Sequence, residues 1–120
     1  MQVFTLRAPE ADETPVVVEV PHAGWGVPED VADDVVVPHR TLVEDSDIYV
    51  DKLCEQAPSV GATYLAARVS RYVVDLNRGP HDVDRQTVPD HPQPQGLQPR
   101  GVVWRLTARG RPALRRPLRY

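Results

Sequence analysis

The sequence predicts an α/β domain built on a mixed sheet with helical crossovers. Short valine-rich runs at residues 16–20 and 72–74 have the length and composition of buried strands and are closed by Pro or Asn. Between them, residues 45–59 carry apolar side chains at spacings of three, four and seven, as an amphipathic helix does. This strand–helix–strand order favours a parallel or mixed sheet over an all-β sandwich.

The length of 120 residues suits a single domain, which can bury a core without disulfide or metal staples. The one cysteine, Cys54, has no partner for an internal disulfide, and a reduced cytoplasmic protein fits this composition best. No apolar stretch approaches the length of a signal-peptide core or a membrane span, so we expect no membrane association. The formal net charge of −3 at pH 7 gives no bulk attraction to nucleic acid.

The first two strands are expected at residues 3–6 and 16–20, on either side of an acidic turn. The second strand leads directly into Pro21-His22-Ala23-Gly24, and polar groups at strand ends are where α/β enzymes keep their chemistry. Residues 23–39 contain Gly and Pro and predict a long loop with one short helical turn. His22 is therefore a candidate site residue.

A single helix is predicted over residues 45–59, because Asp45 and Ser46 resemble an N-cap and Gly61 is typical of a helix end. Asp47, Asp51 and Glu55 would then share one helix face. A solvated acidic stripe explains the last two of these. For Asp47, in the first turn, two alternatives stay open: it complements the helix dipole, or it points toward the loop that carries His22.

The second half of the chain carries shorter apolar runs. Residues 62–67 and 72–74 predict two neighbouring strands or one interrupted strand, and residues 102–106 are strand-like. Residues 79–101 are a Pro-rich, polar connection without apolar periodicity, which predicts an ordered lid or a disordered loop. Since the chain stops soon after the last run, in the middle of its pattern, we expect a domain truncated at its C-terminus.

The last twenty residues hold six arginines and no acidic residue. They could form a nucleic-acid patch, or they could be the solvated side of segments whose acidic partners lie elsewhere in the fold. No aromatic interleaving or recognisable binding motif accompanies these arginines, so the sequence favours the second alternative and no nucleic-acid partner.

His22 and Asp47 make two of the three protein ligands that a catalytic zinc needs. The alternative for His22 is a loop histidine that hydrogen-bonds to backbone. His39, His81 and His91 lie in Pro-flanked loops and are weaker candidates for a third ligand. Neither an HExxH nor a CxxC pattern is present to strengthen a metal site.

Asn77 and Arg78, with Arg71 nearby, suggest the recognition of an anion. A guanidinium fork matches a carboxylate in a bidentate way, and the Asn77 amide adds a donor beside it. The alternatives are that Arg78 forms a salt bridge to Asp75 or Asp82, and that Asn77 only terminates a strand.

Four segments, taken in order, resemble the N-terminal half of the N-formylglutamate amidohydrolases, and the resemblance spans most of the chain. They are Val18-Glu19-Val20-Pro21-His22-Ala23-Gly24, Asp47-Ile48-Tyr49-Val50-Asp51-Lys52-Leu53, the stretch from Gly61-Ala62-Thr63 through Ser70-Arg71-Tyr72-Val73-Val74-Asp75-Leu76-Asn77-Arg78, and Gly101-Val102-Val103-Trp104-Arg105.

The resemblance implies a metal-dependent hydrolase with an α/β fold similar to that of the zinc carboxypeptidases. It implies hydrolysis of the formyl amide of N-formyl-L-glutamate to formate and L-glutamate, a step of histidine degradation. His22 matches the first ligand of Zn²⁺ or another divalent metal, and Asp47 matches the carboxylate ligand. Asn77 and Arg78 match the pair that would hold a substrate carboxylate, with Arg71 assisting.

Two departures from the family pattern bear on function. Ala23 stands where the family usually has serine, and residues 1–120 contain no match to the family's downstream histidine-bearing motif. The expectation is therefore a hydrolase whose third ligand comes from His81, His91 or a partner chain in an oligomer. The alternative is an inactive, truncated member that binds small carboxylates or serves as an interaction module.

Overall fold

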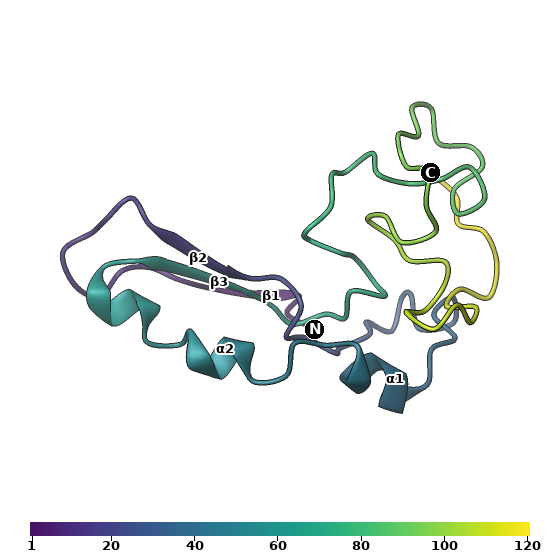
Figure 1. Ribbon diagram of the computed structural model, residues 1–120. Helices are drawn as coiled ribbons and strands as arrows, with labels where there is room; N and C mark the ends of the chain where they lie inside the picture. Colours follow the sequence, from purple (N-terminus) through teal and green to yellow (C-terminus); the bar gives the residue numbers. More distant parts are fainter.

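The computed structural model describes all residues, 1–120, and divides into a small sheet-and-helix half and an irregular half (Figure 1). The elements are β1 (Phe4–Arg7), β2 (Val17–Val20), α1 (His39–Glu44), α2 (Val50–Leu53), the 3₁₀ helix η1 (Ala57–Val60) and β3 (Thr63–Ala67). Residues 68–120 run as turns and loops joined by isolated bridges. No helix is long and apolar enough to cross a membrane.

The sheet is mixed and has the strand order β1-β3-β2. β2 pairs with β3 in parallel, with Val20 opposite Ala66, and β1 pairs with β3 antiparallel, with Leu6 opposite Leu65. The predicted strands at 3–6, 16–20 and 62–67 are confirmed within one residue at each end. The parallel pair requires a crossover, and α1, α2 and η1 lie in it, as the predicted fold class requires.

The prediction of one continuous helix over residues 45–59 is wrong. α1 ends at Glu44, with Asp45 as its C-cap, and Tyr49 then takes a left-handed backbone (φ 67°) that keeps α2 short. Pro58 lies in the first turn of the separate helix η1, which begins at Ala57 and is capped by Gly61, where the helix end was predicted. Gly61 has φ +90°, and a Cβ there would lie 2.2 Å from the Asp12 carbonyl oxygen, so glycine is required.

Asp47 consequently precedes α2 instead of lying in the first turn of a helix. Asp47, Asp51 and Glu55 therefore do not share one continuous helix face, and the predicted acidic stripe is wrong. The reason is local: apolar spacing reports which side chains are buried, but not whether the backbone between them stays helical.

The predicted strands at 72–74 and 102–106 are also wrong. Their backbone groups pair with turns and loops: the Val73 N–H donates to the Ser70 carbonyl at 2.9 Å, and the Val102 N–H donates to the Asp82 carbonyl at 2.7 Å. The Pro-rich residues 79–101 form a hydrogen-bonded loop, with a bond from the Gly96 N–H to the Val83 carbonyl at 3.0 Å. A valine run forms a strand only where a partner strand is available.

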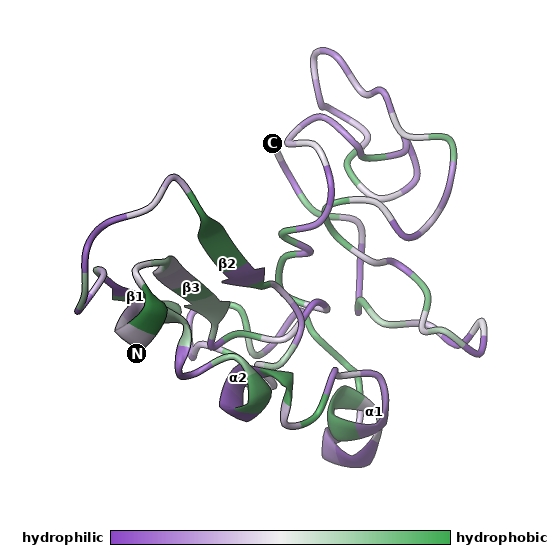
Figure 2. Cartoon of the chain, turned by 60° about the vertical axis from the view of Figure 1, so that its left-hand side comes forward, coloured by the Kyte–Doolittle hydropathy of each residue, from purple (hydrophilic) through white to green (hydrophobic).

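Two hydrophobic clusters hold the molecule together. The first packs the sheet on α2 and η1 through Val20, Tyr64 and Ala66. The second joins α1 to the irregular half, and its members are Val37, Leu42, Tyr72, Trp104 and Ala113. Figure 2 shows the hydrophobic and hydrophilic sides of α1.

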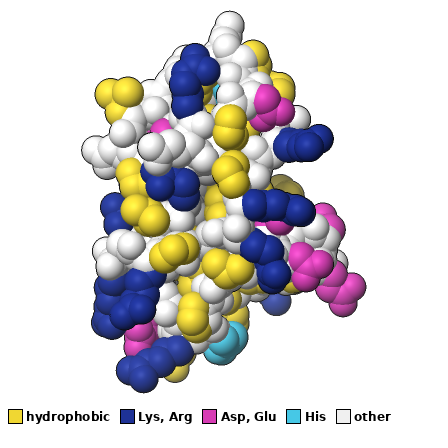
Figure 3. All heavy atoms as spheres, turned by 90° about the vertical axis from the view of Figure 1, so that its right-hand side faces the viewer, with side chains coloured by type: hydrophobic (Ala, Val, Ile, Leu, Met, Phe, Trp, Pro, Cys, Tyr) yellow, Lys and Arg dark blue, Asp and Glu magenta, His cyan; other side chains and the backbone are white.

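The arginines of the last twenty residues take part in contacts within the fold. Arg105 pairs with Asp84 at 3.0 Å, Arg116 pairs with Asp34 at 3.0 Å, and Arg115 donates to the Asp33 carbonyl at 2.6 Å. Figure 3 shows basic side chains spread over this face of the molecule, with acidic side chains among them. These contacts fit the alternative in which the arginines are solvated side chains paired with acidic residues from earlier in the chain, and not a nucleic-acid patch.

Asp84 is predicted to stabilise the irregular half in a pH-dependent way. Burial acts to raise the pKa of this carboxyl, but hydrogen bonds from Thr87 and Arg105 outweigh it and lower the pKa below its ordinary value of 3.8. Its contribution is therefore fully present above pH 3.8 and is lost as the pH falls through the lower folded pKa. In urea unfolding, we expect Asp84→Asn to be less stable than the wild type at neutral pH, by a margin that shrinks in acid.

Asp30→Asn is the matched control for this measurement, because Asp30 is exposed. Its margin against the wild type should stay near zero across the same pH range. A constant margin for Asp84→Asn at every pH would contradict the predicted role of the Asp84 charge.

Candidate functional site

The candidate site lies where the chain leaves β2. His22 follows the last residue of this strand by two positions and is 9% exposed. The backbone N–H of Asp47 donates to the His22 carbonyl at 2.9 Å, so the segment before α2 is fastened to the loop after β2. His22 and Asp47, two of the predicted site residues, are thus held together by a backbone hydrogen bond, and their side chains also approach each other.

Gly24 allows the loop that carries His22 to run against residues 68–70. A Cβ at Gly24 would lie 2.4 Å from the Arg68 carbonyl carbon, closer than any side chain tolerates. Beside it, the Gly26 N–H donates to the Arg68 carbonyl and the Ser70 N–H donates to the Gly26 carbonyl, at 3.1 and 2.9 Å. This close approach places His22 next to the segment that contains Arg71 and Asp75.

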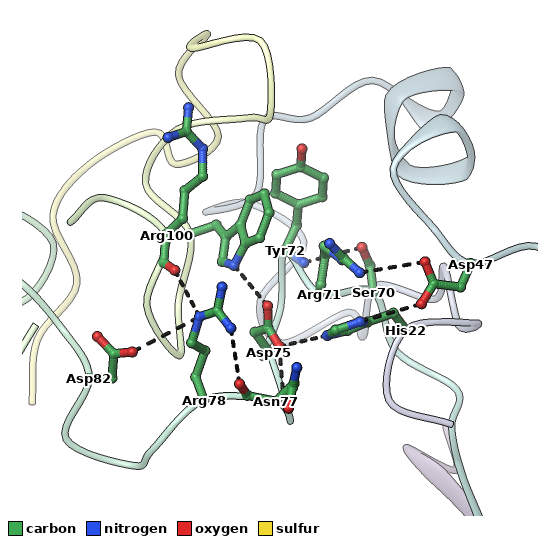
Figure 4. A network of polar contacts seen from close by, with 11 residues as sticks. His22, Asp47, Ser70, Arg71, Tyr72, Asp75, Asn77, Arg78, Asp82 and Arg100 are labelled. Atoms are coloured by element: carbon green, nitrogen blue, oxygen red, sulfur yellow. Dashed lines mark hydrogen bonds and ion pairs between the residues drawn. The ribbon is translucent and has the colours of Figure 1, made fainter. Parts of the chain in front are cut away.

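Asp75 is the main contact of His22. His22 Nε2 lies 2.7 Å from Asp75 Oδ1, which also accepts the backbone N–H of Asn77 at 2.9 Å, and Asp75 Oδ2 accepts the indole N–H of Trp104 at 3.0 Å (Figure 4). The carboxylate is 1% exposed. Burial acts to raise the pKa of Asp75, but the hydrogen bonds from His22, Asn77 and Trp104 outweigh it and lower the pKa.

The ionised Asp75 fixes the protonation of the His22 ring. Because a carboxylate only accepts, the imidazole nitrogen 2.7 Å from it, Nε2, carries the proton and donates. In the neutral ring, Nδ1 then presents a lone pair, and it lies 3.5 Å from Asp47 Oδ2. Two electron-pair donors that face each other at this distance form a place for a cation.

This pair does not complete a metal site by itself. No group of three or more His, Cys, Asp or Glu side chains is placed to hold a metal ion. His81 and His91 lie against each other, with ring centroids 5.5 Å apart, and His91 also contacts Tyr120. His39 is the first residue of α1. The structure therefore brings together His22 and Asp47, with donor types suited to Zn²⁺, but adds none of the other histidines to them.

Arg71 joins the same group. Its Nη2 lies 3.8 Å from Asp47 Oδ1, and its guanidinium carbon lies 5.3 Å from the centroid of the Trp104 ring. Its Nε is buried without a hydrogen-bond partner, and no hydrogen bond engages the rest of the partly exposed guanidinium, so donor capacity remains there for an anion. The predicted grouping of Arg71 with the site is consistent with this position.

Asn77 and Arg78 lie on the far side of Asp75 from Asp47 (Figure 4). Arg78 donates to the carbonyls of Asn77 and Arg100, at 3.0 and 3.3 Å, and its Nε is 4.0 Å from Asp82. Of the two salt bridges considered, the one to Asp82 is long and exposed, and the one to Asp75 is not formed because that carboxylate is already occupied. The Arg78 side chain is exposed and its Nη2 makes no hydrogen bond, so this nitrogen remains accessible to a ligand.

Sequence reasoning missed Asp75 and Trp104 as parts of the site. The sequence offers Asp75 as an ion-pair partner of Arg78, and its position directly after an apolar run is the signal that could have placed it in the site. Nothing in the local sequence points Trp104 toward Asp75, which lies 29 positions earlier.

The site is buried at His22 and Asp75 and exposed at Arg78. Two cavities lie elsewhere: one of about 660 Å³ along α2 and the sheet, and one of about 320 Å³ between α1 and residues 107–112. Neither is lined by His22, Asp75 or Arg71.

Comparison with known proteins finds N-formylglutamate amidohydrolases and deformylases. The family model for N-formylglutamate amidohydrolase matches residues 14–120. N-formylglutamate deformylases of Pseudomonas putida and Pseudomonas aeruginosa are 38% and 40% identical over 68 residues, which is 57% of this chain and 25% of each relative. The crystal structure of N-formylglutamate amidohydrolase from Ralstonia eutropha JMP134 superposes with a TM-score of 0.80 at 35% identity and covers 99% of this chain.

This chain spans less than half the length of these relatives. The chain covers 42% of the Ralstonia eutropha structure and 25% of each Pseudomonas relative. The shared part therefore includes β2, the candidate site and the irregular half, but less than half the length of these relatives.

Proposed function

Because the chain belongs to the N-formylglutamate amidohydrolase family, we propose that it takes part in hydrolysing N-formyl-L-glutamate to formate and L-glutamate in the cytoplasm, as a step of histidine degradation. A zinc carboxypeptidase-like fold of the whole protein is part of this proposal. The observation that carries it is the 3.5 Å approach of His22 Nδ1 to Asp47 Oδ2, with Nε2 hydrogen-bonded to Asp75 at 2.7 Å.

His22 and Asp47 would hold the cofactor, which we propose to be Zn²⁺. The same donor types also accept Co²⁺, Mn²⁺ or Fe²⁺. When bound, the metal supplies a Lewis acid for the formyl oxygen and lowers the pKa of water. A third protein donor is needed beyond this pair, and a partner chain in an oligomer is one source.

The chain's own residues position the reactants. Asp75 holds the Nε2 proton of His22 and so keeps the lone pair of Nδ1 pointed at Asp47, as carboxylates behind metal-binding histidines do. N-formyl-L-glutamate carries two carboxylates, and the two guanidiniums of Arg71 and Arg78 lie on either side of Asp75 (Figure 4). We assign them to these carboxylates, with Asn77 as an additional donor, because a guanidinium fork binds a carboxylate in a bidentate way.

Arg78→Lys is predicted to weaken substrate binding without weakening the metal. An ammonium replaces the planar fork by a point charge, so we expect KM for N-formyl-L-glutamate to rise about 10-fold while the affinity for Zn²⁺ stays unchanged. Steady-state formate release gives the first quantity, and zinc titration gives the second.

Arg85→Lys is the matched control, because Arg85 is exposed in the Pro-rich loop and its side chain makes none of the hydrogen bonds or ion pairs of the site. An unchanged KM in an active preparation of Arg78→Lys would remove Arg78 from the binding assignment.

A second candidate function is supported by the incomplete donor pair and by the fraction of the relatives that the chain covers. In it, the chain is catalytically inactive and binds small carboxylates through Arg71 and Arg78, or serves as an interaction module. The two candidates share the arginines and differ in their requirement for the metal.

The deciding experiment measures formate released from N-formyl-L-glutamate by the purified chain with added Zn²⁺, against a chelator-treated sample. Turnover that the chelator removes is the result expected for the hydrolase. No turnover, together with glutarate binding that does not require metal, is the result expected for the inactive carboxylate-binding member.

A further inference from the structure

Trp104 lies directly behind the candidate site. Its side chain is buried, with 6% of its surface exposed, and it packs edge-on against Tyr72 with ring centroids 5.6 Å apart. Any large apolar side chain could fill this position, but the indole also makes two specific contacts that an aliphatic side chain could not make.

The first contact is made by the indole N–H, which donates to Asp75 Oδ2 at 3.0 Å. The other oxygen of Asp75, Oδ1, is bonded to His22 and to the Asn77 N–H. Since both oxygens are engaged, the carboxylate cannot turn about its axis without breaking a buried hydrogen bond. Trp104 thereby fixes the plane of the group that orients His22.

The second contact is made by the face of the indole. The Arg71 guanidinium carbon lies 5.3 Å from the ring centroid, within cation–π distance. Arg71 Nε has no hydrogen-bond partner, and the nearest carboxylate, on Asp47, is 3.8 Å from Nη2. The guanidinium therefore depends on the indole face for its position.

We propose that Trp104 is a positioning residue that sets the arrangement of the carboxylate-binding and metal-binding parts of the site together. A single rigid, buried side chain determines where Arg71 presents its charge and how Asp75 holds His22. This inference rests on the proposed function, which assigns Arg71 to the substrate and His22 to the metal.

Two variants separate the two contacts. Trp104→Phe keeps an aromatic face under Arg71 and removes the N–H donor, whereas Trp104→Leu removes both. Trp25→Phe is the matched control, since Trp25 is 45% exposed and lies along the cavity next to α2.

For Trp104→Phe, we expect the affinity for Zn²⁺ to fall about fivefold, which is less than the fall caused by removing a group that hydrogen-bonds directly to a metal ligand. The affinity of the metal-free protein for glutarate should change less than about twofold. For Trp104→Leu, both affinities should fall, each about fivefold or more. Trp25→Phe should change neither. A residue with only a packing role would lower the melting temperature of both Trp104 variants and leave both affinities unchanged, and that result would overturn the proposal.

A metal-free measurement separates failure of this inference from failure of the proposed function. In NMR spectra of the wild type, ring current from Trp104 should shift the Arg71 side-chain protons upfield, and the shift should be lost in Trp104→Leu and largely kept in Trp104→Phe. If the wild type neither binds Zn²⁺ nor releases formate, the proposed function fails, and the Arg71 shift still decides the role of Trp104. Arg71 protons at unshifted positions in the wild type would overturn it.

Discussion

Replacing His22 with alanine is expected to abolish chelator-sensitive formate release and to weaken Zn²⁺ binding by more than the roughly 10–100-fold that follows loss of an outer-shell partner. The variant removes Nδ1, the donor that faces Asp47 at 3.5 Å, and leaves a single carboxylate to hold a divalent ion. Zinc stoichiometry of the purified protein and formate release measure the two effects.

His39→Ala is the matched control for this variant. His39 opens α1, its side chain is exposed, and it lies outside the group formed by His22, Asp47 and Asp75. Zinc content and activity should match the wild type. Unchanged zinc stoichiometry in His22→Ala would rule out His22 as a ligand, whatever happened to activity.

The sheet could be predicted from the sequence because its signals are local. Residues 3–6, 16–20 and 62–67 are short apolar runs bounded by turn residues, and each forms a strand. The runs at 72–74 and 102–106 have similar composition but no strand beside them, so their N–H groups pair with loop carbonyls instead. Strand formation depends on a partner, and the sequence of the run does not contain that information.

The helical crossover was harder to predict for a related reason. Burial of Val50, Cys54 and Ala57 against the sheet produces the expected spacing, yet the backbone is interrupted by the left-handed Tyr49 and by Pro58. The interruption has a consequence for the site, because it leaves Asp47 between α1 and α2, where its N–H reaches the His22 carbonyl. The second alternative for Asp47, pointing toward the His22 loop, is the one that the structure supports.

For the candidate site too, some residues can be identified from the sequence around them, whereas the contacts between them cannot. His22 and Arg78 could be identified because each belongs to a short polar motif that follows an apolar run, and Arg71 could be identified as a guanidinium suited to an anion. The contact between His22 and Asp75 joins residues 53 positions apart, and the contact between Asp75 and Trp104 joins residues 29 positions apart. One sequence without its fold gives the chemical types of these groups but not their pairing.

Asp75→Asn is predicted to weaken Zn²⁺ binding about 10–100-fold, although Asp75 would not touch the metal. The asparagine has one oxygen and one NH₂ group where the aspartate presents two acceptor oxygens to three donors, namely His22 Nε2, the Asn77 N–H and the Trp104 N–H. If its oxygen accepts from His22 Nε2, its NH₂ faces the donor N–H of Trp104, and a buried donor is left unsatisfied. If the amide is turned over, the NH₂ donates to Nε2, and the proton of a neutral His22 ring must move to Nδ1, where it blocks the lone pair that faces Asp47.

Asp51→Asn supplies the control for this change, because Asp51 lies in α2 and its side chain takes part in none of the contacts of His22. Isothermal titration with Zn²⁺ separates the variants, and circular dichroism of the metal-free proteins shows whether Asp75→Asn remains folded. A folded Asp75→Asn protein with the zinc affinity of the wild type would mean that Asp75 serves packing and hydrogen bonding within the core alone. The ring ¹⁵N shifts of His22 report which nitrogen carries the proton. If the zinc affinity falls and the Nδ1-protonated tautomer increases, the loss is assigned to the orientation of the histidine and not to a general loss of stability.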